Sequence, residues 1–172
     1  MGNILLISEN NELIDKFKQL FDRRLYNLNS CCTSTSLFDL IEVEEPDVFI
    51  FDENIQMLDL LSSVKKIKSK SENSQILLIT DGQKVDSELV SLVCGFIFPE
   101  YSYDFIVTTV NNDIKIKENL DKLSARNNDM AESLYRLNVL YNTSSQFAGT
   151  LNSKELLTYM TEGLDKSLSF DL

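Results

Sequence analysis

Short apolar runs alternate with stretches of helical periodicity through the first hundred residues. The runs occupy residues 4–7, 25–28, 48–51, 76–79 and 96–98. Between them, apolar side chains recur at intervals of three and four, which predicts four amphipathic helices. Their faces are Leu13, Phe17, Leu20 and Phe21; Leu37, Leu40 and Ile41; Leu60, Leu61, Val64 and Ile67; and Val85, Leu89, Leu92 and Val93. This alternation predicts an α/β fold with right-handed crossovers, a parallel sheet and helices on both faces.

The run at residues 48–51 ends on the carboxylate of Asp52. It is apolar at every position, whereas a half-exposed strand would alternate apolar and polar residues. The run therefore predicts a strand that is buried on both faces. In open α/β sheets, ligands and chemistry collect at the carboxyl ends of the strands. Asp52 is the first candidate functional residue for that reason.

The runs and the residues that end them resemble a response-regulator receiver domain over roughly residues 1–112. The resemblance rests on residues 4–9, on Pro46-Asp47 through Asp52, on residues 76–80 and on Phe98-Pro99, with Ile55 and Asp59 at the family's spacing. It implies a flavodoxin-like, doubly wound sheet of five parallel strands in the order 2-1-3-4-5. It also implies that Asp52, Glu9 and Thr80 meet at one edge, and that the Phe98–Pro99 peptide is cis.

The resemblance assigns a role to each of these side chains. Asp52 stands at the phospho-acceptor position and Thr80 at the position whose hydroxyl contacts the phosphoryl group. The family's Mg²⁺ is held by acids, which leaves Glu9 and Asp52 as a weak pair of ligands. A sensor histidine kinase would be the phosphodonor partner. The expected function is that of a signalling module of the two-component type, without enzymatic activity of its own.

The chain departs from the family's pattern at several positions. Ser8-Glu9 replaces an acidic pair, Phe98 replaces a Lys, Asp81 a small residue, Gly95 an aromatic residue, and Gln56 and Leu60 the Pro and Gly that often follow the acceptor. Phosphoryl transfer depends above all on charge stabilisation, and Phe98 removes the cation that would supply it. Ser8 offers Mg²⁺ only a neutral oxygen. We therefore expect a degenerate receiver that is phosphorylated weakly or not at all.

Each candidate also has a purely structural interpretation. Asp52 can cap the loop that follows its strand, and Thr80-Asp81-Gly82 can be ordinary turn chemistry. Glu9, followed by two asparagines, can belong to the loop that caps the first helix. Phe98 can be a packing residue at the rim of the core.

Composition narrows the function further. A formal charge of −11 disfavours nucleic-acid binding, which relies on clustered Lys and Arg. The chain has no His, and Cys31, Cys32 and Cys94 lack C-x-x-C spacing, so zinc and iron–sulfur sites are not expected. Five scattered glycines form no phosphate loop. With no leader pattern and no apolar run of membrane length, we expect a cytoplasmic protein with no membrane partner.

A second pattern begins at Ser102, which can cap a helix that opens at Tyr103. Neither Pro nor Gly interrupts the chain from there to Ser144, so the helix should run about thirty residues past the usual end of a receiver. Its apolar residues follow heptad spacing and form a seam. The seam comprises Ile116, Leu120, Leu123, Asn127, Met130, Leu134, Leu137 and Tyr141, and ends at Ser144.

A seam this narrow predicts a parallel two-stranded coiled coil, hence a homodimer. Asn127 at an a position favours two strands in fixed register. The alternative is a helix that folds back on its own receiver, although a globular face usually needs a wider apolar stripe.

The end of the chain resembles the entry to a GAF domain. The resemblance rests on residues 140–147 and 151–157, with Ser153 capping a helix that carries Leu156, Leu157, Met160 and Leu164. It implies that an output domain continues beyond Leu172. The expected organisation is a receiver-like part at residues 1–101, its last helix continuing as a coiled-coil linker at 102–146, and the start of a truncated GAF-like domain at 147–172.

Two classes of function remain open on the sequence. The first is a non-enzymatic input module that relays through a paired helix, favoured by Phe98 and Ser8. The second is a working phospho-acceptor receiver that uses Asp52 with Mg²⁺, supported by Glu9 and Thr80. A third class, a flavodoxin-like redox or nucleotide enzyme, lacks the phosphate loop it would need.

Overall fold

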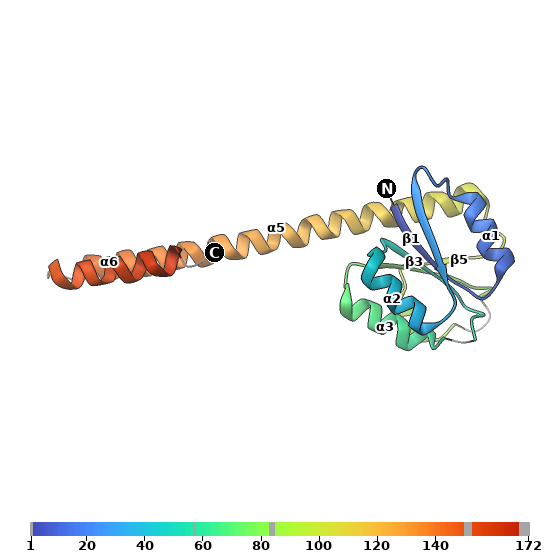
Figure 1. Cartoon of the computed structure of the whole chain (residues 1–172), viewed down its shortest axis with the longest axis horizontal. Helices are drawn as coiled ribbons and strands as arrows, with labels where there is room; N and C mark the ends of the chain where they lie inside the picture. The colour runs from blue at the N-terminus through green and yellow to red at the C-terminus, as the bar shows by residue number, and fades with distance from the viewer. Residues whose placement is uncertain (1, 57, 83–84, 150–152, 169–172) are drawn as a thin grey trace. The chain divides into compact units, whose positions relative to one another are not determined.

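The computed structural model describes residues 2–56, 58–82, 85–149 and 153–168. Five parallel strands form one sheet in the order β2-β1-β3-β4-β5, which confirms the predicted order. The strands are β1 (Gly2–Ile7), β2 (Tyr26–Cys31), β3 (Val48–Asp52), β4 (Gln75–Ile79) and β5 (Gly95–Ile97). All five residues of β3 are buried, as its unbroken apolar run predicted. Figure 1 shows the sheet with helices on both faces.

The helices are α1 (Asn11–Leu20), α2 (Ser34–Glu44), α3 (Leu60–Lys70), α4 (Ser87–Leu92), α5 (Tyr103–Gly149) and α6 (Ser153–Leu168). Helices α1 to α4 each begin behind a polar cap whose side chain accepts a backbone N–H of the first turn: Asn10, Thr33, Asp59 and Asp86. Such caps satisfy donors that have no partner within the helix. The helices therefore start where the capping residues stand.

Two apolar cores lie on the two faces of the sheet. Side chains of α2, α3 and α4 pack on one face around Leu37, Val64 and Leu89. Helices α1 and α5 cover the other face, with Phe17 and Val110 at its centre. All four predicted amphipathic faces are in these cores or packed against them. This arrangement leaves the carboxyl ends of the strands open to carry a site.

Two details differ from the sequence-based expectation. Strand β2 begins at Tyr26 rather than Leu25, because the N–H groups of both residues donate to the Asp22 carbonyl in a turn, which leaves Leu25 exposed. The Phe98–Pro99 peptide is trans, so the expected cis bond is wrong. The trans form is the intrinsically preferred one even before proline.

Helix α5 begins as predicted, with the Ser102 hydroxyl accepting the Phe105 N–H at 3.3 Å. The chain divides into two compact units, residues 1–121 and 122–172. Within the first unit, Ile106, Val110 and Ile114 of α5 are buried. At the end of this unit the Lys117 ammonium pairs with Asp47 at 3.3 Å and with Asp121 at 3.2 Å.

The second unit contains the remainder of α5 and helix α6. A Cβ at Gly163 of α6 would lie 2.5 Å from a side-chain carbon of Thr143, so the absence of a side chain lets the two helices approach closely. Leu151, Asn152 and the terminal residues 169–172, on which the GAF resemblance partly rests, lie outside the described residues. Within the described ranges, no helix combines the length and the apolar character that crossing a bilayer requires.

Candidate functional site

Asp52 lies at the carboxyl end of β3, almost fully buried and hydrogen-bonded on both carboxylate oxygens. The Ser8 hydroxyl donates to Oδ2 at 2.6 Å, and the Asn54 backbone N–H donates to Oδ1 at 3.0 Å. Ile7 and Phe51 are paired in register, so the next residue of each strand, Ser8 or Asp52, lies at the same sheet edge. The predicted place of Asp52 at the carboxyl end of this strand is therefore confirmed, and Ser8, which replaces an acid, is hydrogen-bonded directly to it.

Glu9 reaches the same edge from the loop after β1. It lines, together with Asp52 and Asn54, an open cavity of about 420 Å³. One of its carboxylate oxygens accepts the Gln56 backbone N–H at 3.0 Å, which fixes the loop after β3 to the loop after β1. None of the described residues that line this cavity carries a positive charge. The cavity thus offers little to offset the charge of a phosphoryl group.

Thr80 follows β4 and is buried, and its hydroxyl has two hydrogen bonds. It donates to the carboxylate of Glu53 and accepts the Gly82 N–H at 2.9 Å. Glu53 is a site residue that sequence reasoning missed. Its only sequence signal was its place directly after Asp52, because the contact with Thr80 depends on the register of β3 and β4. A carboxylate of the chain itself thus accepts the hydroxyl that the resemblance assigned to a phosphoryl oxygen.

Phe98 stands where the resemblance would place a Lys, and it is a packing residue. Its ring meets Tyr101 edge-on, with 5.3 Å between the ring centroids. It also lies close to Gly82, where a Cβ would be 3.3 Å from the ring. Gly82 has a φ of +82°, a backbone conformation that residues other than glycine rarely adopt. Phe98 therefore packs beside the turn after Thr80 and contributes no charge.

The resemblance implies Mg²⁺ at this edge, with Glu9 and Asp52 as its ligands. Mg²⁺ needs near-octahedral oxygen ligands, usually one or two carboxylates with water and phosphate. Asp52 and Glu9 line one cavity, but Ser8 and Asn54 already bond the first and Gln56 the second. The described residues contain no group of three acidic, His or Cys side chains placed to hold a metal. The carboxylates do not make a preformed Mg²⁺ site.

Cys31 does not add a reactive thiol to this edge. Cys31 ends β2, and its carbonyl accepts the Ser8 N–H at 3.0 Å. Burial, assisted by neighbouring Cys32, raises the pKa of the Cys31 thiol to about 11. The thiolate is the reactive form, so Cys31 is a poor nucleophile at neutral pH.

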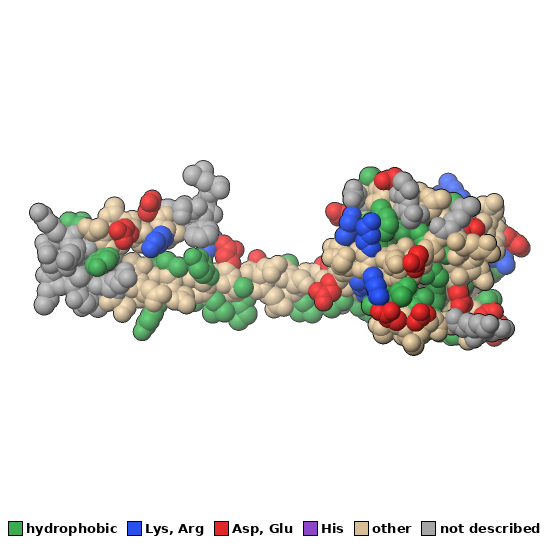
Figure 2. All heavy atoms as spheres, turned by 90° about the horizontal axis from the view of Figure 1, so that it is seen from below, with side chains coloured by type: hydrophobic (Ala, Val, Ile, Leu, Met, Phe, Trp, Pro, Cys, Tyr) green, Lys and Arg blue, Asp and Glu red, His purple; other side chains and the backbone are tan. Residues whose placement is uncertain are grey.

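The predicted seam lies on α5 as its spacing required. Leu120 is partly buried, and the other large apolar side chains of the seam are exposed by between 46 % at Ile116 and 74 % at Tyr141. Figure 2 shows apolar side chains at the surface of this helix. Thr143, which contacts α6, lies two residues beyond Tyr141 and so about 200° around the helix. Helix α6 therefore packs on the face opposite the seam and leaves the seam uncovered within the second unit.

Comparison with solved structures finds the same fold in bacterial receivers. The N-terminal signal receiver domain of a two-component response regulator from Bacteroides fragilis is 17% identical, with a TM-score of 0.59 over 66% of this chain and 97% of that chain. A response regulator receiver domain protein from Clostridium thermocellum is 18% identical, with a TM-score of 0.61 over 70% and 99%. Full-length FixJ from B. japonicum is 17% identical, with a TM-score of 0.62 over 96% and 89%.

Neither the models of protein families nor the curated proteins match this sequence. At identities below a fifth, the structural likeness establishes the fold alone. The chain therefore has the receiver fold.

Proposed function

We propose that this chain is a receiver-like signalling module, without enzymatic activity, in which phosphorylation of Asp52 is weak or absent. The observation that carries the proposal is that the polar groups of the site already have partners within the chain. Ser8 and Asn54 bond Asp52, and Glu53 accepts the hydroxyl of Thr80. A phosphodonor would have to displace these bonds before it could react.

Charge points in the same direction. A loose phosphoryl-transfer transition state is stabilised by cations placed around its oxygens. Here Phe98 holds the place of the cation, and Glu53 brings a further carboxylate to Thr80. Both differences raise the barrier to phosphorylation. The receiver fold is retained, and it can still pass a conformational change to whatever follows it.

The second candidate is a working phospho-acceptor that uses Asp52 with Mg²⁺ and a sensor histidine kinase. One observation favours it: Asp52 and Glu9 line the same open cavity, so a donor and an ion can approach from solvent. The two candidates differ in the extent to which Asp52 reacts.

Intact-mass spectrometry after incubation with acetyl phosphate and Mg²⁺ separates the candidates. We expect a small modified fraction in the parent chain and a larger one in Phe98→Lys, because the lysine restores a cation. Phe105→Lys is the matched control, since Phe105 of α5 also packs on Tyr101 but is half-exposed. Near-complete modification of the parent that disappears in Asp52→Ala would establish the second candidate instead.

We further propose that two copies pair in parallel through the seam on α5 and relay a change in the receivers toward an output domain beyond Leu172. No nucleic acid or membrane is part of this function. The support is the heptad spacing, the exposure of the seam and the position of α6 on the opposite face. The GAF resemblance of residues 147–172 makes a GAF-type domain the expected output.

The energetics of the seam set a condition on this pairing. Each chain offers seven apolar seam side chains, most of them about half exposed. Burying the exposed half of each is worth roughly 1 kcal/mol, so two chains gain on the order of 10–15 kcal/mol. Association costs about 4–15 kcal/mol. The pair is therefore favourable only when most of the seam is buried in register, which makes it sensitive to single substitutions.

A further inference from the structure

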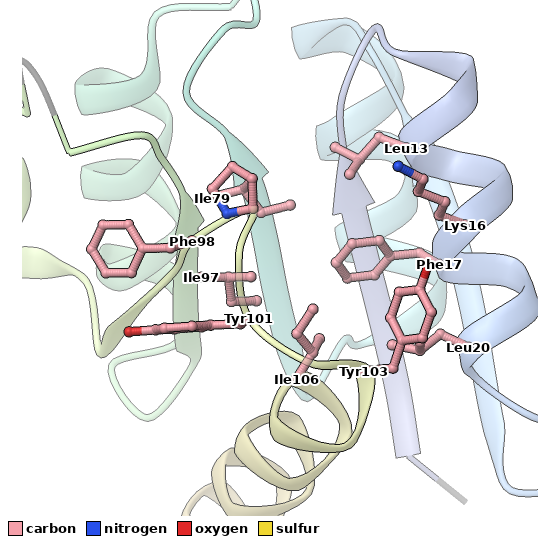
Figure 3. Close-up of a pocket in the computed structure, with 11 residues that line it drawn as sticks. Leu13, Lys16, Phe17, Leu20, Ile79, Ile97, Phe98, Tyr101, Tyr103 and Ile106 are labelled. Atoms are coloured by element: carbon pink, nitrogen blue, oxygen red, sulfur yellow. The ribbon is translucent and has the colours of Figure 1, made fainter.

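The first unit contains a cavity that the site around Asp52 does not use. It measures about 170 Å³ and lies between α1 and the ends of β4 and β5, with the start of α5 at its side. Figure 3 shows its two walls facing each other across an open space. One wall is Leu13, Phe17 and Leu20 of α1, and the other consists of Ile79, Ile97, Tyr101 and Ile106. Figure 3 shows the ring of Tyr103, which also lines the cavity, beside Leu20 on the α1 side. The walls are mostly aliphatic and aromatic.

The ring of Phe98 leaves the cavity unfilled. Phe98 borders the cavity, but Figure 3 shows its ring directed away from Phe17. That ring packs on Tyr101, and Tyr101 packs on Phe105 with centroids 4.5 Å apart. These rings hold one another in place, so none of them closes the space beside α1.

The volume limits the occupant to a small molecule. An apolar protein cavity of about 150 Å³ stays dry and binds benzene, whereas drug-sized ligands need about 300–1,000 Å³. A volume of about 170 Å³ accommodates one ring or a short branched chain. A mostly apolar occupant is favoured, because most of the lining side chains are aliphatic or aromatic.

One charged side chain lies in the lining, and its positive charge favours an occupant with a negative group. Lys16 lines the cavity and is solvent-exposed, so its ammonium lies on the solvent side. Figure 3 shows the Lys16 amine beside Leu13, and the structure records no hydrogen bond or ion pair for it among the described residues. We propose that this cavity binds a small monocarboxylate, with its ring or branched chain between the walls and its carboxylate at Lys16.

The cavity also adjoins the candidate site. Leu13, Ile79 and Pro99 border both this cavity and the open cavity that Asp52 and Glu9 line. An occupant therefore packs against the residue that precedes Thr80. The binding itself does not depend on whether Asp52 is phosphorylated, so the proposal stands or fails separately from the proposed function.

Methyl NMR of the full chain with labelled isoleucine tests the proposal, with phenylacetate as the probe and phenylacetamide as its uncharged analogue. We expect saturable shifts of the Ile79, Ile97 and Ile106 methyls, with a dissociation constant on the order of 1 mM. Ile55, which belongs to the core on the other face of the sheet, should not move. Phenylacetamide should bind more weakly than phenylacetate.

Two surface variants test the role assigned to the ammonium. Lys16→Gln should weaken phenylacetate roughly two- to fivefold, as expected for an exposed ion pair, and leave phenylacetamide unchanged. Lys18→Gln, an exposed lysine on the same helix that does not line the cavity, should change neither. Absence of saturable shifts, or shifts centred on Ile55, would overturn the site. Equal affinity of Lys16→Gln and the parent for phenylacetate would overturn the carboxylate assignment.

Discussion

At the residue scale, Asp113 has an unusual environment. It is buried on α5, and its Oδ2 atom has no hydrogen-bond partner among the described residues. Burial raises the pKa of its carboxyl from 3.8 to about 6. Because a raised pKa penalises the ionised form in the folded state, stability falls as pH rises from about 4 to about 6, and the full loss persists above that range.

Asp113→Asn should therefore stabilise the fold at pH 7.5 by up to about 3 kcal/mol, and by much less at pH 4. Urea unfolding at the two pH values measures the difference. Asp129→Asn is the control, because Asp129 is exposed on the same helix and should change stability little at either pH. An Asp113→Asn variant with the same stability as the parent at pH 7.5 would show that burial does not penalise the ionised form of this carboxyl.

The hydroxyl of Thr80 gives a second prediction at this scale. Thr80→Val should cost about 1–3 kcal/mol, because it leaves the Gly82 N–H and Glu53 without their partner in a buried site. Glu53→Gln should cost less than 1 kcal/mol, since an amide oxygen still accepts the hydroxyl. Thr109→Val, which removes an exposed hydroxyl, is the control. Thermal unfolding that ranks Glu53→Gln as the worse variant would contradict this account of the bond.

At the element scale, the sequence predicted strands and helices best where the burial of their residues is uniform or periodic. The run before Asp52 identified β3, whereas β2 shifted because it is an edge strand with mostly half-buried residues and a weak apolar signal. Site residues at strand ends were predictable from the same runs. Glu53 was not, because its contact with Thr80 joins residues 27 positions apart and depends on strand register.

The structure also refines where the receiver part of α5 ends. Ile114 is buried, and Lys117 pairs with Asp47, so α5 belongs to the first unit as far as Asp121. A shortened chain that keeps the fold should therefore end after Asp121 rather than near Asn112.

Substitution of Asn127 tests whether helix α5 pairs with a second copy. In a parallel pair, the two Asn127 amides would bond each other at a cost in stability, and misalignment would bury them against leucine. Asn127→Leu should raise the melting temperature and broaden the oligomer distribution seen by light scattering. Asn128→Leu, one residue away and off the seam, should do neither. A melting temperature lowered by Asn127→Leu would argue that the helix is solvated rather than paired.

At the scale of the whole molecule, the receiver fold has a site whose polar groups are hydrogen-bonded within the chain, and helix α5 carries an exposed apolar seam. The proposed relay from the receiver fold toward an output domain requires that two copies hold this helix in fixed register. The parallel pair is therefore the central claim. Leu120 and Leu134, both a positions of the seam, are fourteen residues apart along it.

Disulfide cross-linking at these two positions tests the claim most directly. The background replaces Cys31 with Ala and Cys32 and Cys94 with Ser, and each seam cysteine, Leu120→Cys or Leu134→Cys, is introduced alone. In a parallel pair in register, every a position faces its own copy, so both variants should form covalent dimers under mild oxidation, while Asn128→Cys should not. In an antiparallel pair at most one of the two positions can face itself. Cross-linking at only one position, or at neither, would contradict the parallel pair.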